Sequence, residues 1–229
     1  MLHDSRLLRN PLELQSATAL EPLFDCMDWR MVRASPRYRF RELGCPEGDF
    51  ILVKQGILSI LQIADNGTRS IAALRYAGEF IQPREASVGF FVQSLVASEV
   101  LIGRSDNLRQ VLKQNEALAW HVSCHAERNH AISYQWLSNR GRHAEARVAH
   151  LLCETAYRVG VSTSEKMELP FTQVQIAEMT ALTPVHVCRI LGKLAERGIV
   201  TRRGRGLWAR PGGPPGRRAV SSSCRQSGS

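Results

Sequence analysis

The sequence predicts an α+β chain: an antiparallel β-roll of the jelly-roll type (a double-stranded β-helix), then one long helix, then short helices closed by a β-hairpin. Three observations predict this order. Between about residues 38 and 103, short runs of Val, Ile, Leu and Phe alternate with Gly, Pro, Asn and Asp, which is typical of small antiparallel barrels. A proline-free stretch with apolar residues three and four apart follows, which favours a helix. The last third contains helix-capping residues and a glycine between arginines, as expected of short helices and a hairpin.

The predicted roll consists of short strands separated by turns. The strand candidates are residues 50–53, 57–63, 70–74 and 92–102. Asp65-Asn66-Gly67 lies between two of them, and Asn-Gly readily adopts the positive φ angles of a tight hairpin turn. Residues 1–22 have a mixed composition and are expected to form a loose or helical lead-in. We therefore predict a β-roll domain over residues 1–104.

The long helix is predicted over residues 105–140, with candidate N-caps in Ser105-Asp106-Asn107. Its apolar seam is formed by residues spaced mostly three or four apart, among them Leu108, Val111, Leu118, Val122, Ile132 and Trp136. A seam of this length either pairs with a second chain or packs on the chain's own roll. Asn115 and Asn129 also fall on the seam, and they favour pairing because a polar seam residue can fix the register of two helices.

Charge is unevenly distributed along the 229 residues, whose formal net charge is +9. The first 100 residues carry −1, the next 100 carry +3, and the last 29 carry +7, since they contain seven arginines and no acid. This distribution indicates that the C-terminal part contacts a polyanion; a solvated arginine-rich tail is the alternative. Residues 211–229, rich in Pro, Gly, Ser and Arg, are expected to be a disordered basic tail.

The composition excludes several classes of protein. No apolar run approaches the roughly 20 residues of a membrane span, and the N-terminus lacks a signal peptide, so we expect a cytoplasmic protein without a membrane partner. The six cysteines form no CxxC pair, which argues against a zinc ribbon or a disulfide-stapled domain. The chain contains no Gly-x-Ser-x-Gly, phosphate-cradling glycine loop or His-Glu-x-x-His. We therefore do not expect an enzyme and assign no catalytic residues.

Residues 171–198 have the signals of two short helices joined by a tight turn. They follow a hinge at residues 140–142 and a helix predicted over 143–158. Thr172 and Gln175 have the spacing of a capping box, and Thr183-Pro184 provides an N-cap followed by proline at the first helical position. The inward residues are Ile176 and Ala177 on the first helix and Val187, Ile190 and Leu194 on the second. With Gly198 as the C-cap signal, the segment predicts a helix-turn-helix within residues 142–210.

The second of these helices would enter the DNA major groove with its N-terminal end. We expect Arg189 to read a base, since guanidinium pairs bidentately with guanine, and His186 and Lys193 to contact phosphate. Arg202, Arg203 and Arg205 lie on a predicted hairpin that would act as a basic wing on the backbone. The candidate DNA-binding residues are Thr172, Gln173, Thr183, Pro184, Val185, His186, Cys188, Arg189, Lys193, Arg202, Arg203 and Arg205.

In the order roll, long helix, hinge and helix-turn-helix, the chain resembles the Crp–Fnr family of bacterial transcription regulators over about residues 22–208. The matching motifs are Ala77-Gly78-Glu79-Phe80, the Ala146-Arg147-Val148-Ala149-His150-Leu151-Leu152-Cys153-Glu154 segment and Leu182-Thr183-Pro184-Val185-His186-Val187-Cys188-Arg189. Residues 130–142 resemble a branch common in alphaproteobacteria. The resemblance implies a cyclic nucleotide-binding-like sensor roll, a homodimer joined through the long helix and a palindromic site on double-stranded DNA. It also implies contact with RNA polymerase if the protein is an activator.

The chain departs from the family at its effector positions. Val88 and Gly89 stand where cyclic-AMP-binding members hold the phosphate with an Arg-Ser pair, so we do not expect cyclic AMP to bind. The candidate effector pocket is Gly78, Glu79, Phe80 and Arg84. Cys26 and Cys45 are too few and too far apart for the family's iron–sulfur cluster, and His3 lies outside the roll, which argues against histidine-ligated haem. Val185 replaces a common glutamate, so the half-site should differ from those of other members.

Other residues suggest redox or metal chemistry. Cys188 precedes Arg189 on the predicted DNA face, and its oxidation would place bulk or negative charge against phosphate; a harmless half-buried cysteine is the alternative. His121, Cys124 and His125 have a spacing that can hold a metal on one helix face, but no fourth ligand is evident, and we assign no metal site. A different class of function is a small-molecule or redox sensor that acts through a protein partner instead of DNA.

Overall fold

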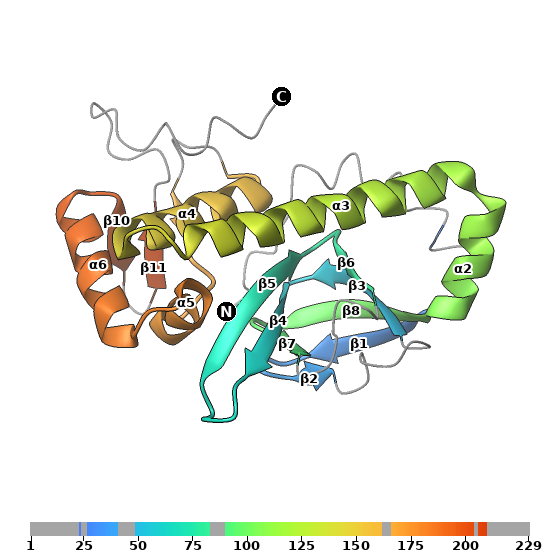
Figure 1. Cartoon of the computed structure of the whole chain (residues 1–229), viewed down its shortest axis with the longest axis horizontal. Helices are drawn as coiled ribbons and strands as arrows, with labels where there is room; N and C mark the ends of the chain where they lie inside the picture. The colour runs from blue at the N-terminus through green and yellow to red at the C-terminus, as the bar shows by residue number, and fades with distance from the viewer. Residues whose placement is uncertain are drawn as a thin grey trace. The chain divides into compact units, whose positions relative to one another are not determined.

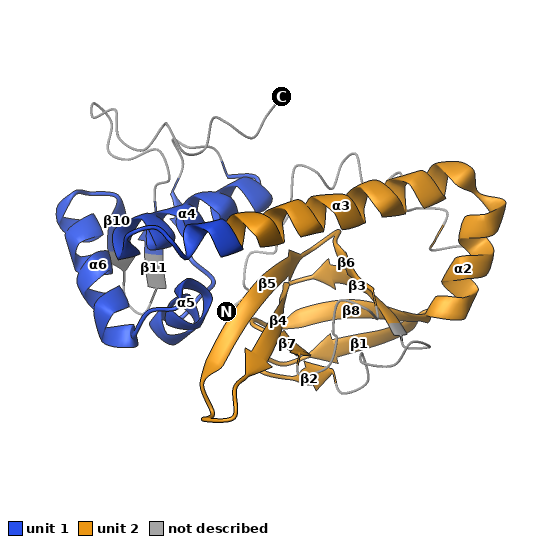
Figure 2. Ribbon diagram, viewed as in Figure 1, with its two compact units in different colours: residues 1–7, 137–229 blue, residues 8–136 orange. Residues whose placement is uncertain are grey.

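The computed structural model describes residues 23, 27–40, 49–82, 90–161, 166–203 and 206–209. The chain divides into two compact units, one within residues 8–136 and the other within residues 137–229 (Figure 2). Figure 1 labels the elements of both units. In the described residues, no helix is both long and apolar enough to cross a membrane.

The first unit contains two four-stranded antiparallel sheets (Figure 1). One sheet has the order β1-β8-β3-β6 and the other β2-β7-β4-β5. The strands are β1 (Arg30–Ala34), β2 (Arg39–Phe40), β3 (Asp49–Gln55), β4 (Ile57–Ile63), β5 (Arg69–Tyr76), β6 (Phe80–Ile81), β7 (Phe90–Ser94) and β8 (Ser98–Arg104). The predicted jelly-roll class is confirmed. The single strand expected over 92–102 is wrong in detail, because residues 95–97 separate β7 from β8.

The predicted Asn-Gly hairpin joins β4 to β5. Gly67 has φ +79°, and its N–H donates to the Ala64 carbonyl at 2.8 Å. The Ala64 N–H donates to the Thr68 carbonyl at 2.9 Å, and the Asn66 side chain accepts from the Thr68 N–H at 2.9 Å. The turn therefore forms because glycine tolerates this backbone angle and asparagine bonds its own loop.

Two apolar clusters hold the roll together. One gathers inward residues from both sheets, including Ile51, Leu58 and Val92. The second joins Phe50 and Phe80 of the first sheet to Leu108, Leu118 and other residues of the helices that follow. Burial of these side chains removes apolar surface from water and fixes the helices on their own roll.

The predicted long helix is two helices, α2 (Ser105–Gln114) and α3 (Glu116–Asn139). Asn115 interrupts the helix: its backbone is extended, and its side-chain oxygen accepts from the Leu118 N–H at 3.0 Å. Asn115 is thus a cap for α3 and not a seam residue. The helix begins at Ser105, as predicted, but its N-cap is Arg104, with no side-chain cap, and not one of the candidate residues 105–107.

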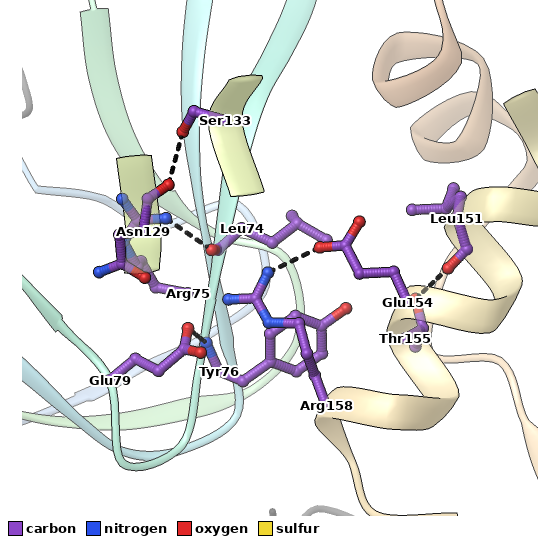
Figure 3. A network of polar contacts seen from close by, with 10 residues as sticks. All are labelled: Leu74, Arg75, Tyr76, Glu79, Asn129, Ser133, Leu151, Glu154, Thr155 and Arg158. Atoms are coloured by element: carbon purple, nitrogen blue, oxygen red, sulfur yellow. Dashed lines mark hydrogen bonds and ion pairs between the residues drawn. The ribbon is translucent and has the colours of Figure 1, made fainter. Parts of the chain in front are cut away.

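The seam predicted for pairing with a second chain is largely buried within the first unit. Leu118 and Val122 belong to the cluster that contains Phe50 and Phe80, and Asn129 is buried. The Asn129 amide lies 3.1 Å from His125 Nδ1. The backbone carbonyl of Asn129 accepts from the Ser133 hydroxyl at 3.0 Å (Figure 3). For these positions the packing on the chain's own roll, left open above, is the observed arrangement.

His125, which was considered as a metal ligand, packs against an aromatic ring of the roll. Its ring stacks on Phe80 with centroids 4.0 Å apart, while His121 and Cys124 are exposed. Within the part of the chain that the structure describes, no group of three or more His, Cys, Asp or Glu residues could hold a metal ion. His125 therefore couples α3 to β6 of the roll.

In its described residues, the second unit contains helices α4, α5 and α6 and a three-stranded sheet of order β10-β11-β9. Its elements are α4 (Ala144–Arg158), β9 (Met167–Glu168), α5 (Gln173–Thr180), α6 (Pro184–Glu196), β10 (Val200–Arg203) and β11 (Gly206–Ala209). The helix predicted after residues 140–142 is confirmed: α3 ends at Asn139, and His143 caps α4 by accepting from the Ala146 N–H at 3.0 Å. The hinge itself stays a prediction. Within α4, the buried Arg158 donates to Glu154 at 2.8 Å (Figure 3).

Candidate DNA-binding site

The first helix of the predicted motif is fixed by its capping box. The Thr172 hydroxyl accepts from the Gln175 N–H at 3.2 Å, and the Gln175 side chain accepts from the Thr172 N–H at 2.8 Å. Helix α5 ends at Ala181, whose φ of +52° is left-handed. Two N–H groups at the start of α5 are therefore satisfied without solvent, which fixes the angle at which the chain enters the helix.

The second helix is capped as predicted. The Thr183 hydroxyl accepts from the His186 N–H at 3.2 Å, and Pro184 occupies the first helical turn. At the other end, Gly198 has φ +69°, and the Ile199 N–H donates to the Leu194 carbonyl at 2.9 Å. The ends of α6 are thus set by local sequence, as the two signals predicted.

One face of α6 is buried and the other is exposed. Val187, Ile190 and Leu194 are buried, together with Ile176 and Ala177 of α5. The exposed predicted DNA-binding residues are Thr172, Thr183, Pro184, Val185, His186, Cys188, Arg189 and Lys193, and Gln173 is half-buried. The first turn of α6 contains no acidic residue, so no carboxylate of that turn repels phosphate. All of these side chains but the half-buried Gln173 are therefore exposed in the described second unit.

The predicted hairpin is also present. Strand β10 pairs with β11 in antiparallel register, with Arg202 opposite Leu207 and Arg203 opposite Gly206. The side chains of Arg202 and Arg203, and the whole of Arg205, lie outside the described residues. The wing assignment of these arginines stays a prediction.

Arg147 is a positioning residue that sequence reasoning missed. It lies on α4, and its Nη1 donates to the Thr180 carbonyl at 2.9 Å and to the Ala181 carbonyl at 3.4 Å. These are carbonyls at the C-terminal end of α5, which the helix itself leaves without partners. A positive guanidinium is stabilised at the negative end of the α5 dipole. Arg147 therefore stabilises the end of α5 and holds the turn before α6. No local pattern reveals it, because 33 residues separate donor and acceptor.

His150 of α4 has a perturbed titration. Burial lowers its pKa below the usual 6.5; Glu154 acts in the opposite direction and Arg142 lowers it further. Burial disfavours the charged imidazolium because it removes water from the ring. The neutral form of His150 is therefore the one that the folded second unit accommodates.

The candidate effector residues of the roll are occupied by structural contacts. Gly78 has φ +81° and donates to the Val53 carbonyl at 2.8 Å. The buried Glu79 accepts from the Tyr76 N–H at 2.9 Å (Figure 3), and Phe80 is fully buried. Arg84, Val88, Gly89, Cys26, Cys45 and His3 lie outside the described residues, so the expectations placed on them stay predictions.

Comparison with known proteins agrees with this geometry. The Crp-like helix-turn-helix domain family matches residues 146–209. A probable transcriptional activator of Rhizobium leguminosarum bv. viciae is 22% identical over 65% of this chain and 63% of its own length. A probable transcriptional regulator, flp, of Lacticaseibacillus casei is 26% identical over 68% of this chain and 72% of its own length. The match to the first relative thus spans less than two thirds of that protein.

Solved structures share the fold. FixK2 of Bradyrhizobium japonicum has a TM-score of 0.70 at 20% identity, covering 80% of this chain and 93% of that one. A CooA mutant of Carboxydothermus hydrogenoformans has a TM-score of 0.66 at 19% identity, covering 92% and 94%. These likenesses show that the chain shares with both structures the fold of a β-roll followed by a helix-turn-helix. Residues 146–209 of the chain thus match the Crp-like helix-turn-helix domain family, and the fold of the chain is similar to those of FixK2 and CooA.

Proposed function

We propose that the protein binds a palindromic site on double-stranded DNA as a homodimer, with α6 of each copy in the major groove of one half-site. The observation that carries this proposal is the capped α6, which exposes Arg189 on a face without acid in its first turn. A helix-turn-helix dimer reads two half-sites about one helical turn apart, and the symmetry of the site follows that of the protein. Phosphate contacts supply most of the affinity, so binding falls steeply with salt.

The proposed dimer contact is the exposed face of α3. Trp120 and Tyr134 are 69% and 70% exposed, and they are two heptads apart, so two helices that supercoil around each other keep both on one seam. Leu137, three residues beyond Tyr134, is 63% exposed. Large apolar side chains lined up on one helix face mark a protein contact more often than a solvated surface. This face differs from the seam inferred from the sequence.

The proposed input is a signal sensed in the β-roll or the thiol redox state. Phe80 connects the roll core to α3 through the stacked His125, so a change in the roll can reach the proposed dimer helix. Cys188 is exposed one residue before Arg189, which makes DNA binding sensitive to its oxidation. On the sequence grounds given above, we propose no role for cyclic AMP, haem or an iron–sulfur cluster. Contact with RNA polymerase belongs to the proposal if the protein activates transcription.

The test is the mass of the protein in sedimentation equilibrium, alone and on a selected DNA duplex. We expect a dimer alone and two chains per duplex, and we expect Trp120→Asp with Tyr134→Asp to yield a folded monomer of weaker DNA affinity. Tyr157→Asp is the matched control, since Tyr157 is an exposed aromatic residue of α4. A monomer that binds DNA one chain per duplex, or a double variant that stays dimeric, would contradict the proposal.

A further inference from the structure

Val185 is an apolar residue that the fold leaves in solvent. It is 62% exposed, although the next valine along α6, Val187, is fully buried. Its position is not that of a frayed helix end, because Thr183 caps the first turn and Pro184 fixes the backbone before it. Packing within the described unit therefore gives no reason for a branched apolar side chain at this place.

Val185 lies one helical turn from the exposed Arg189. Helix positions four apart lie on one face, so Val185 and Arg189 are neighbours, and both are exposed. A β-branched valine is also stiff, since one side-chain rotamer dominates in a helix. The recognition end of α6 thus presents a fixed pair of methyl groups beside a guanidinium.

We infer that Val185 is a specificity-determining residue whose methyl groups pack on the C5-methyl of a thymine in the major groove. The inference rests on the proposed DNA-reading role of α6 and names what that helix reads. Each base pair presents a distinct pattern of hydrogen-bond donors and acceptors in the major groove. The C5-methyl of thymine is the apolar group in this set of patterns. Valine has neither donor nor acceptor, so it adds no hydrogen bond to any base edge and discriminates through apolar contact alone.

The helix geometry also limits how far this thymine can lie from the guanine that Arg189 reads. With a rise of about 1.5 Å per residue, Val185 and Arg189 lie about 6 Å apart along α6. Neighbouring base pairs are about 3.4 Å apart along the duplex. The thymine that Val185 contacts is therefore within about two base steps of the guanine that Arg189 reads, and it occurs once in each half-site.

The test uses the operator selected by the reduced full-length protein, in which each thymine is replaced in turn by uracil. This exchange removes one methyl group and leaves every hydrogen-bonding atom in place. We expect one symmetric pair of thymines, within two steps of the Arg189 guanine, at which uracil weakens binding about fourfold per half-site. Val185→Ala should bind thymine and uracil duplexes equally at that pair.

The control is Val174→Ala, which makes the same chemical change at a 49% exposed valine on α5. It should retain the full thymine preference of the parent. Circular dichroism establishes that both variants are folded. Equal binding of thymine and uracil by the parent at every position, while it still selects a symmetric motif, overturns the role of Val185 and leaves the proposed function intact. Failure to select any motif overturns both.

Discussion

In the proposed function, Arg189 is the residue on which sequence reading by α6 depends. It is exposed on the face opposite Val187 and Ile190, which are buried. We predict that Arg189→Ala loses about 1–3 kcal/mol of discrimination at one base pair in each half-site, because the guanidinium pairs bidentately with guanine. Competition binding with single-base-pair variants of the operator measures this loss.

Lys193→Ala is the matched comparison for Arg189. It removes an exposed charge one turn further along the same helix, and we expect it to weaken all sequences similarly and to reduce the salt slope by about one ion. If Arg189→Ala selected the same sites with the same preferences as the parent, the recognition-helix assignment would be wrong.

His150 predicts a pH dependence of stability. Burial lowers its folded-state pKa below 6.5, so as pH falls below 6.5 the unfolded chain takes up the proton first. The contribution of His150 to the free energy of unfolding is therefore fully present above pH 6.5. It is lost progressively as the pH falls toward the folded-state pKa of His150. Urea denaturation at pH 7.5 and 5.5 should show a smaller loss for His150→Gln than for the parent. An equal loss in both proteins would remove His150 as the cause.

The asparagines of the long helix show why single residues are hard to place from sequence. Asn115 and Asn129 have the periodicity of a paired seam, yet Asn115 caps α3 and Asn129 is buried beside His125. Periodicity identifies which positions share a face but not what covers that face. The exposed Trp120 and Tyr134 become visible only once the roll has taken the other side of α3.

The helix-turn-helix was predictable at the scale of elements because its signals are local. Thr172 with Gln175, and Thr183 with Pro184, set both helix starts in the structure. Strands β2, β6 and β9 were missed because each has two residues, too few for an alternating pattern. Their existence depends on partner strands that are distant in sequence.

Arg147 links two elements, and its removal should affect both stability and binding. We predict that Arg147→Met costs about 1.5–3 kcal/mol of unfolding free energy, because the Thr180 carbonyl loses a charged donor. DNA affinity should fall for all sequences, with an unchanged salt slope, since Arg147 acts through the turn and not on phosphate. Denaturant melts and binding at several salt concentrations measure both effects.

The control for Arg147 is Arg142→Met, which removes an exposed arginine just before α4. Its unfolding free energy should stay within about 0.5 kcal/mol of the parent. A similar loss of stability in the two variants would show that general charge, and not the bond to the end of α5, is responsible.

Gly192 predicts a stabilising substitution in α6. A Cβ built there meets nothing within 4 Å, so Gly192→Ala should add up to about 1 kcal/mol from helix propensity. A rise in the melting temperature of the free protein is the expected readout. The comparison is Gly56→Ala, which should destabilise the roll, since Gly56 has φ +97° and its Cβ would meet Ala97 and Ser98. A fall in melting temperature for Gly192→Ala would contradict the account of α6.

On the scale of the whole molecule, the order of the roll, the helices and the basic end could be predicted from the sequence. The contacts that each of them makes could not. The spacing of apolar residues distinguished the roll from the helices. The positive charge of the last 29 residues distinguished the basic end from the rest of the chain. Contacts between side chains that are distant in sequence could not be predicted. Phe80 illustrates this, since its ring stacks on that of His125 of α3 with centroids 4.0 Å apart.

The central claim is that a dimer reads a symmetric DNA site through α6. Selection from random duplex DNA by the purified, reduced protein tests it most directly. The account predicts a two-fold symmetric motif with half-sites about one helical turn apart, and loss of its enrichment after oxidation if Cys188 senses redox state. Enrichment of an asymmetric single half-site, or of no sequence with or without added cell extract metabolites, would contradict it and favour a sensor that acts on a protein partner.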